Sequence, residues 1–218
     1  MATPVDDHRT PQRLNKRQQQ AVETRERMLR AAAEIFAERG YQAASVGAIT
    51  TRADTAHGTF YLYFRNKEDA FAQVFATVTD QIRERSRAGL SDDRYEGATG
   101  VIRGLLSVFH EHPGLIRAMV EGMMASPQVE QLWRDMRADF ASRLAHHLEH
   151  EQANGVVRAL EPDAAAQALA SMTEWYAFTH LVLGDPTSPA TQDDLDDAVA
   201  TLADLWYHAV YGTTDRTS

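Results

Sequence analysis

Cysteine is absent from the 218 residues, so disulfide bonds and thiolate metal sites are excluded and a reducing, cytoplasmic compartment is expected. No apolar run approaches the roughly 20 residues that a membrane span needs, so no membrane partner is expected. The polar, basic N-terminus lacks the apolar segment of a secretory signal. No segment alternates with the period of two that marks a strand. No nucleophile–base motif or phosphate loop indicates an enzyme, and no cofactor is expected.

Positive charge is scarce except near the N-terminus. The net charge is −9, but residues 1–87 contain 14 Lys and Arg against 11 Asp and Glu, whereas the remainder contains 8 against 20. A basic end on an acidic body suits a protein that meets a polyanion at one end only. An ordinary solvated surface can have the same charge asymmetry. Charge alone therefore does not favour polyanion binding over a surface without such a partner.

Apolar spacing predicts an all-α chain of about nine helices in two parts. We expect a disordered basic arm over 1–19, a helical head over 20–67, a larger helical body over 68–212 and a flexible tail over 213–218. Prolines and glycines mark the ends of the later elements. They place body helices at about 94–111, 114–125, 128–153, 163–183 and 192–211.

The head has the pattern of a helix-turn-helix. A long helix ends at Gly40, and a short helix capped by Ser45 is followed by a tight break and a second short helix with Phe60 and Phe64 facing inward. Asn66 caps the next helix. The second short helix suits the major groove of DNA, with small residues at its start and hydroxyls for phosphates. The candidate DNA-binding residues are Ser45, Ala56, His57, Gly58, Thr59, Tyr61, Tyr63 and Lys67.

The stretch from Thr24 to Phe75, TRERMLRAAAEIFAERGYQAASVGAITTRADTAHGTFYLYFRNKEDAFAQVF, resembles the DNA-binding domain of the tetracycline-repressor (TetR) family. The matching elements are Ala32, Phe36, Gly40, Ser45-Val46, Ile49, Gly58-Thr59-Phe60-Tyr61, Tyr63-Phe64 and Lys67-Glu68. Two positions depart from it, because the family often has Gly where Asp54 stands and Ser where Ala56 stands. Loss of that serine puts a cap and a phosphate contact at Ala56 in doubt. Tyr61 and Tyr63 could also pack on the head instead of facing DNA.

The body is rich in large, adaptable side chains, which line ligand pockets but also fill ordinary cores. The segments Ser126–Trp133, Ala168–Phe178 and Leu205–Gly212 resemble the ethionamide-resistance repressor (EthR) branch of the family. That resemblance implies an elongated apolar ligand tunnel, with Ala170 and Thr173 where polar asparagines are expected. The candidate ligand-binding residues are Phe109, Met119, Met123, Trp133, Met136, Phe140, Ala170, Met172, Thr173, Trp175, Tyr176 and Phe178.

Charge and histidine add two further expectations. Because the body is acidic, we expect a neutral or cationic apolar ligand, whereas an anionic one needs a specific cation such as Arg103 or Arg117. His146 and His150 are spaced to share a metal ion, but their segment is strongly polar, and a solvated face is the preferred interpretation with no metal site.

These features predict a ligand-responsive repressor that binds a palindromic DNA operator and is released by a hydrophobic small molecule. Its homodimer is expected to form through the helices at about 163–183 and 192–211, which would make a four-helix contact. One alternative is a constitutive DNA-binding or architectural protein without a ligand. Another is a helical enzyme that uses the histidines and carboxylates of the body.

Overall fold

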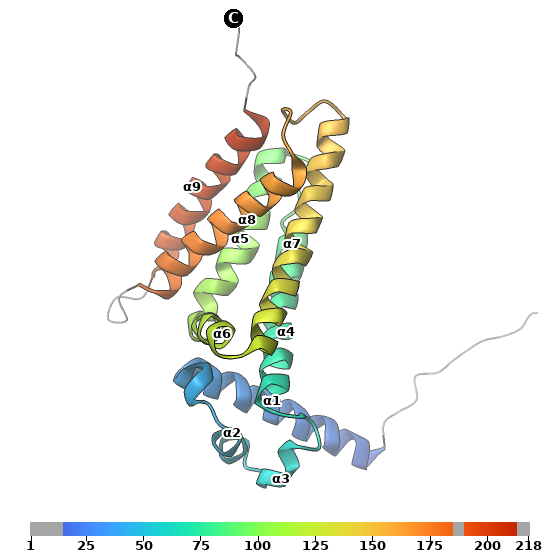
Figure 1. Ribbon diagram of the computed structural model, residues 1–218, viewed down its shortest axis with the longest axis vertical. Helices are drawn as coiled ribbons and strands as arrows, with labels where there is room; N and C mark the ends of the chain where they lie inside the picture. Colours follow the sequence, from blue (N-terminus) through green and yellow to red (C-terminus); the bar gives the residue numbers. More distant parts are fainter. Residues whose placement is uncertain (1–14, 185–189, 213–218) are drawn as a thin grey trace, which may run out of the picture.

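The computed structural model describes residues 15–184 and 190–212, which form nine α-helices and one π-helical turn, with no strand among them (Figure 1). The predicted all-α class is therefore confirmed. A three-helix head lies at one end of the molecule, and the longer helices of the body extend away from it. Residues 1–14 of the expected arm and the expected tail at 213–218 lie outside the described residues.

The head consists of α1 (Lys16–Ala43), α2 (Val46–Arg52) and α3 (His57–Phe60). α1 begins four residues before the expected start at 20. Asn15 caps it, because its side chain accepts a hydrogen bond from the backbone N–H of Gln18 while the Gln18 side chain accepts one from the Asn15 N–H.

The backbone of α1 changes direction at Gly40, where φ is 76° and ψ is 177°. That conformation is open mainly to glycine. One further helical turn follows and carries Tyr41 into the core. Gly40 therefore interrupts the first helix at the position where the sequence predicted its end.

The helix-turn-helix follows the predicted order. The Ser45 side chain caps α2 by accepting a hydrogen bond from the N–H of Ala48 at 3.2 Å. The tight break is centred on Asp54, which has a φ of 50° in the left-handed region. That value gives a physical reason for glycine at this position in similar sequences. α3 is shorter than the sequence suggested, although Phe60 and Phe64 are both buried as expected.

The body is a bundle whose longest helices run away from the head (Figure 1). Pro113, Pro127 and Pro162 each occupy the first helical position, where a missing N–H costs nothing. The elements are α4 (Lys67–Ala88), α5 (Arg94–Glu111), α6 (Pro113–Ala125), α7 (Pro127–Ala153), α8 (Pro162–Ala177), the π-helical turn η1 (Phe178–Val182) and α9 (Gln192–Tyr211).

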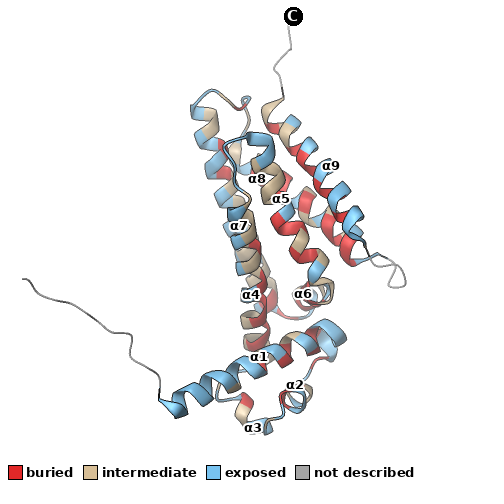
Figure 2. Ribbon diagram, turned by 180° about the vertical axis from the view of Figure 1, so that it is seen from behind, coloured by how far each residue is buried: buried red, intermediate tan, exposed pale blue. Residues whose placement is uncertain are grey.

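Two body helices, α4 and α6, pack against the head. α4 begins at the head, where the rings of Phe71 and Phe36 meet edge to face with centroids 4.8 Å apart, and then continues into the bundle. α6 lies across α1, and its Gly114 packs directly on the backbone of Ala37. Figure 2 shows buried residues on the inner faces of the body helices and an exposed outer face along α1.

Candidate functional sites

The exposed tip of the head is formed by the start of α3 and the turn after it. Ala56, His57 and Gly58 are exposed, and Tyr61 is 55% exposed. A methyl group added at Gly58 would meet no protein atom within 4 Å, so this side of α3 faces open space. The His57 and Tyr61 rings meet edge to face at 5.8 Å. This small, polar surface has the size and donors that the major groove accepts.

Other predicted DNA-binding residues also make contacts within the head. Thr59 and Tyr63 are half-buried, and Tyr63 packs against the core. The Lys67 ammonium donates a hydrogen bond to the Tyr41 carbonyl at 3.0 Å and lies 4.4 Å from the Tyr41 ring centroid. Because Lys67 holds the end of α1, its removal would weaken the fold as well as any phosphate contact.

Two capping positions differ in their side chains. Ser45 is exposed and caps α2, but Ala56 at the start of α3 makes no side-chain cap. Arg65 was not predicted from the sequence, but its side chain, between α3 and α4, is 87% exposed and has only a 3.4 Å contact with Asp69. Its place beside the predicted recognition helix was the available signal. In contrast, Arg52 is held by Glu34 and Glu38 at 2.8 and 2.7 Å and joins α2 to α1.

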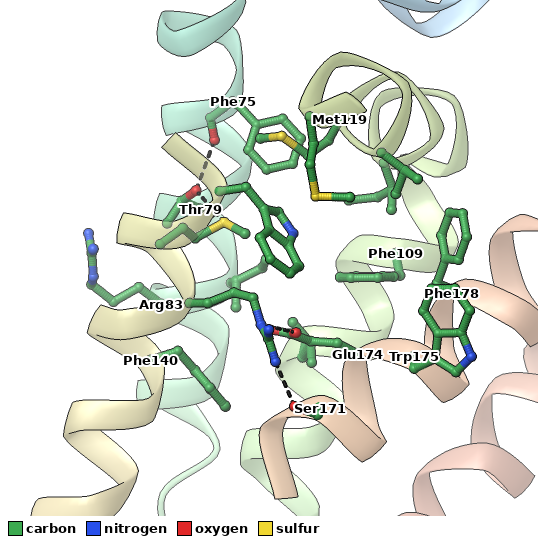
Figure 3. A pocket seen from close by; sticks show the side chains of 18 of the residues that line it. Phe75, Thr79, Arg83, Phe109, Met119, Phe140, Ser171, Glu174, Trp175 and Phe178 are labelled. Atoms are coloured by element: carbon green, nitrogen blue, oxygen red, sulfur yellow. Dashed lines mark hydrogen bonds and ion pairs between the residues drawn. The ribbon is translucent and has the colours of Figure 1, made fainter. Parts of the chain in front are cut away.

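The body contains a cavity of about 360 Å³ bounded by α4, α5, α6, α7, α8 and η1 (Figure 3). Its wall is mostly apolar, which is typical of small-molecule sites. The lining residues are Phe75, Thr79, Ile82, Arg83, Leu105, Phe109, Ile116, Met119, Val120, Met123, Trp133, Met136, Arg137, Phe140, Arg143, Ser171, Glu174, Trp175 and Phe178.

Eight of the twelve predicted ligand-binding residues line this cavity, and their binding of a ligand stays a prediction. They are Phe109, Met119, Met123, Trp133, Met136, Phe140, Trp175 and Phe178. The contribution of α4 was not predicted from the sequence, although Phe75 and Ile82 belong to the apolar stripe that the helix buries. That stripe could not show which of its members face a cavity.

The other four predicted residues lie outside the cavity wall, and helical periodicity gives the reason. The face of α8 and η1 that lines the cavity carries Ser171, Glu174, Trp175 and Phe178, at the three- and four-residue spacing of one helix side. The adjacent positions lie off that side of the helix. These positions include Ala170, Met172, Thr173 and Tyr176.

Two of these four have defined roles in the fold. Thr173 is 1% exposed, and its hydroxyl donates to the Leu169 carbonyl at 2.9 Å and accepts a hydrogen bond from the Trp206 indole N–H at 2.9 Å. It therefore joins α8 to α9. Tyr176 stacks on His180 with ring centroids 4.0 Å apart.

A polar cluster interrupts the apolar wall where α7 faces α8. Arg137 Nε lies 2.7 Å from Glu174 Oε2, and the Arg137 Nη2 group donates to Ser171 Oγ at 2.6 Å. The guanidinium also lies 4.6 Å from the centroid of the Trp133 ring. Burial raises the pKa of Glu174 above its ordinary value, and the charge of Arg137 opposes that rise. Figure 3 shows Ser171 and Glu174 pointing across the cavity from α8.

The predicted cations for an anionic ligand are placed elsewhere. Arg117 donates to the Val182 carbonyl at 2.6 Å, and Arg103 forms an ion pair with Asp196. Neither lines the cavity. Besides Arg137, the arginines of the wall are Arg83 and Arg143, which share Asp139 as a partner.

The side chains of His146 and His150 are 86% and 72% exposed, and the described part of the chain holds no group of three or more His, Asp or Glu that could bind a metal. Within residues 15–184 and 190–212, no helix has the length and apolar character to cross a membrane.

Known proteins resemble both parts of the chain. Residues 28–74 match the family model of bacterial regulatory proteins of the tetR family, and residues 98–212 match the C-terminal domain of the transcriptional regulator EthR. The HTH-type transcriptional regulator YdgC of Bacillus subtilis is 31% identical over 180 residues, which cover 78% of this chain and 89% of that protein.

Solved structures share the fold. A transcriptional regulator from Saccharomonospora viridis in complex with choline aligns with a TM-score of 0.70 at 19% identity, covering 87% of this chain and 98% of that one. The fatty acid degradation regulator FadR from Bacillus halodurans aligns with a TM-score of 0.70 at 20% identity, covering 84% and 94%.

Proposed function

The chain belongs to the TetR family of bacterial transcriptional regulators, and on this premise we propose that it is a ligand-responsive repressor. Proteins of this family are DNA-binding regulators and not enzymes. The proposal is that a homodimer binds a palindromic operator and that a hydrophobic small molecule in the body releases it. The single observation that supports a response to ligand is that α6 both lines the cavity and forms hydrogen bonds to the head.

The α6 connection is specific. Met119, Val120 and Met123 of this helix line the cavity, whereas Glu121 points to the head. The two Glu121 carboxylate oxygens accept hydrogen bonds from the N–H groups of Tyr41 at 2.8 Å and Gln42 at 3.1 Å. A ligand that shifts α6 would therefore change the angle of α1. Such a ligand favours one state only by its difference in affinity for the two.

The dimer is proposed to form through the outer faces of α8 and α9. Large apolar side chains are exposed on or next to these elements, namely Leu205 of α9 at 49% and Leu183, directly after η1, at 53%. Two-fold dimers bury a self-complementary apolar patch of this kind.

Within this dimer, the candidate DNA contacts are the residues at and around α3 named above, with Tyr61 and Gly58 at the exposed tip. Two heads related by a two-fold axis require half-sites about 34–36 Å apart or a multiple of that spacing. The surface of α3 would supply base contacts, and hydroxyls and backbone N–H groups would contact phosphates.

Selection from a library of random DNA duplexes tests the proposal. Enrichment of a palindrome with half-sites about one helical turn apart, or a multiple of it, is expected. Recovery of a single half-site, or of no common sequence, would contradict the dimeric operator. If the selected duplex binds but no cavity ligand ever releases it, the chain is a constitutive DNA-binding protein.

A further inference from the structure

The inference concerns the class of ligand, and it rests on the proposed function of the cavity. We propose that the cavity takes an amphipathic carboxylate, whose head group binds Arg137 in place of Glu174 and whose apolar part lies among the aromatic and methionine side chains. Three observations carry this proposal: the geometry of Arg137, the charges of the wall and the position of Glu174.

Arg137 is held in place but is not fully hydrogen-bonded. Its guanidinium stacks on Trp133 and donates to Ser171, so it has a fixed orientation. Its buried Nε–H group is paired with the Glu174 oxygen at 2.7 Å, but that oxygen lies off the N–H direction. A misaligned contact of this kind is weaker than a linear hydrogen bond. A planar carboxylate can satisfy Nε–H and a neighbouring N–H together in the two-pronged geometry that guanidinium favours.

Among the charges of the wall, Arg137 is the cation that an anion can reach by replacing one carboxylate. Arg83, Arg137 and Arg143 line the cavity against Glu174 as the one acidic residue of its wall. Asp139, which lies outside that wall, pairs with Arg83 and Arg143, and Asp80 also pairs with Arg83, so the charges of these two arginines are compensated. α5, α6 and η1 contribute only apolar side chains to it. Glu174 is thus the charge that an anionic head group would replace beside Arg137, whereas the acidic character of the whole body led us to expect a neutral or cationic ligand.

Glu174 is positioned so that a ligand carboxylate can replace it as the partner of Arg137. Its side chain is 20% exposed, and its ion pair with Arg137 is made at a single close contact. A ligand carboxylate on Arg137 would leave Glu174 beside a second negative charge, which favours uptake of a proton by Glu174. The neutral acid is the form that the buried position already favours. Binding of the anion is therefore coupled to protonation of a group that belongs to the protein.

The test measures the binding of three probes with the same apolar chain to the full-length protein. Decanoate, decanol and decyltrimethylammonium are titrated by calorimetry, and quenching of tryptophan fluorescence reports the cavity because Trp133 and Trp175 line it. We expect decanoate to bind at least about tenfold more tightly than either other probe, which corresponds to about 1.4 kcal/mol.

Variants locate the head group. Arg137→Met should remove the preference for decanoate, whereas Glu174→Gln, which is nearly isosteric, should tighten decanoate and weaken decyltrimethylammonium. Arg134→Met is the matched control, because Arg134 is on the same helix, is 64% exposed and pairs with Glu130 outside the cavity. It should leave all three affinities unchanged. Should Arg137→Met fail to fold, the opposite shifts in Glu174→Gln decide the question.

The outcomes separate this inference from the proposed function. Equal binding of decanoate and decanol, or tighter binding of the cation, overturns the carboxylate assignment but leaves an apolar ligand site. An unchanged decanoate preference in folded Arg137→Met, or no opposite shifts in Glu174→Gln, overturns the role of the pair. Failure of all three probes to bind the unmodified protein counts against the carboxylate and against the cavity as a ligand site.

Discussion

The carboxylate of Glu121 in α6 accepts a hydrogen bond from the backbone N–H of Tyr41 in α1, with 2.8 Å between the two heavy atoms. The contact exists because Gly40 brings the chain close: a Cβ atom at that position would lie 2.2 Å from Glu121 Oε2. Burial holds Tyr41 in place and raises the pKa of its hydroxyl to about 12. Body and head thus meet through a charged side chain and the backbone where α1 is interrupted.

Glu121→Gln should weaken this connection. One of the two N–H groups would face an amide NH₂ instead of a carboxylate oxygen, and we expect the free energy of unfolding to fall by about 1 kcal/mol. Thermal denaturation followed by circular dichroism measures the change. Glu130→Gln is the control, because Glu130 is 40% exposed and pairs only with the exposed Arg134. Equal stability of the two variants would show that the Glu121 contact contributes little.

Gly58→Ala should affect DNA binding and not folding. The added methyl group meets no protein atom, and alanine favours the helix, so stability is expected to stay the same or rise slightly. If α3 approaches base edges, the same methyl group should weaken operator binding by about 1–3 kcal/mol, the range of one good base contact. A gel-shift titration on the selected duplex measures it. Unchanged affinity would remove this side of α3 from the DNA surface.

Leu205→Glu should separate the two protomers. The side chain is 49% exposed on α9, and a buried charge at the proposed interface would have no partner. We expect a monomer in sedimentation velocity and a loss of operator binding, since one head cannot span both half-sites. Leu90→Glu is the control, because Leu90 is 66% exposed in the loop between α4 and α5. A dimeric Leu205→Glu protein would place the interface elsewhere.

The affinity for decanoate should depend on pH through Glu174. Binding of the anion raises the pKa of Glu174 further, so the complex takes up a proton and affinity increases as the pH falls toward that pKa. The affinity for decyltrimethylammonium should change in the opposite direction. Calorimetry across the pH range in which decanoate stays ionised measures both. Since Glu174→Gln lacks the titrating group, its profiles should be flat, and an unchanged slope in that variant would assign the proton to another group.

Much of the fold could be predicted because local signals agree with one another. Ser45 and Asn66 cap helices as expected, and prolines open α6, α7 and α8. The same signals indicated the head, whose apolar spacing and turn residues are local in sequence. The start of α1 was missed because its first turn is wholly polar and depends on the capping box of Asn15.

The cavity could be predicted only in part, because it depends on which side of each helix faces which neighbour. The aromatic and methionine content of the body led to the prediction of eight residues that line the cavity. Ala170 and Thr173 were predicted from the family resemblance, and they lie on another side of α8. The position of Arg137 on the cavity wall could not be predicted from the sequence, since an arginine on a polar helix normally faces solvent. Only the packing of α7 on α8 brings it beside Glu174.

The central claim is that occupation of the cavity controls DNA binding, and one pair of variants tests it most directly. Met123→Trp fills the cavity from α6, whereas Met124→Trp adds the same side chain at the next residue, which is 82% exposed. Fluorescence anisotropy of the selected duplex is measured while decanoate is added. We predict that decanoate releases the duplex from the unmodified protein and from Met124→Trp but no longer changes the binding of Met123→Trp. A normal response from Met123→Trp would contradict the account.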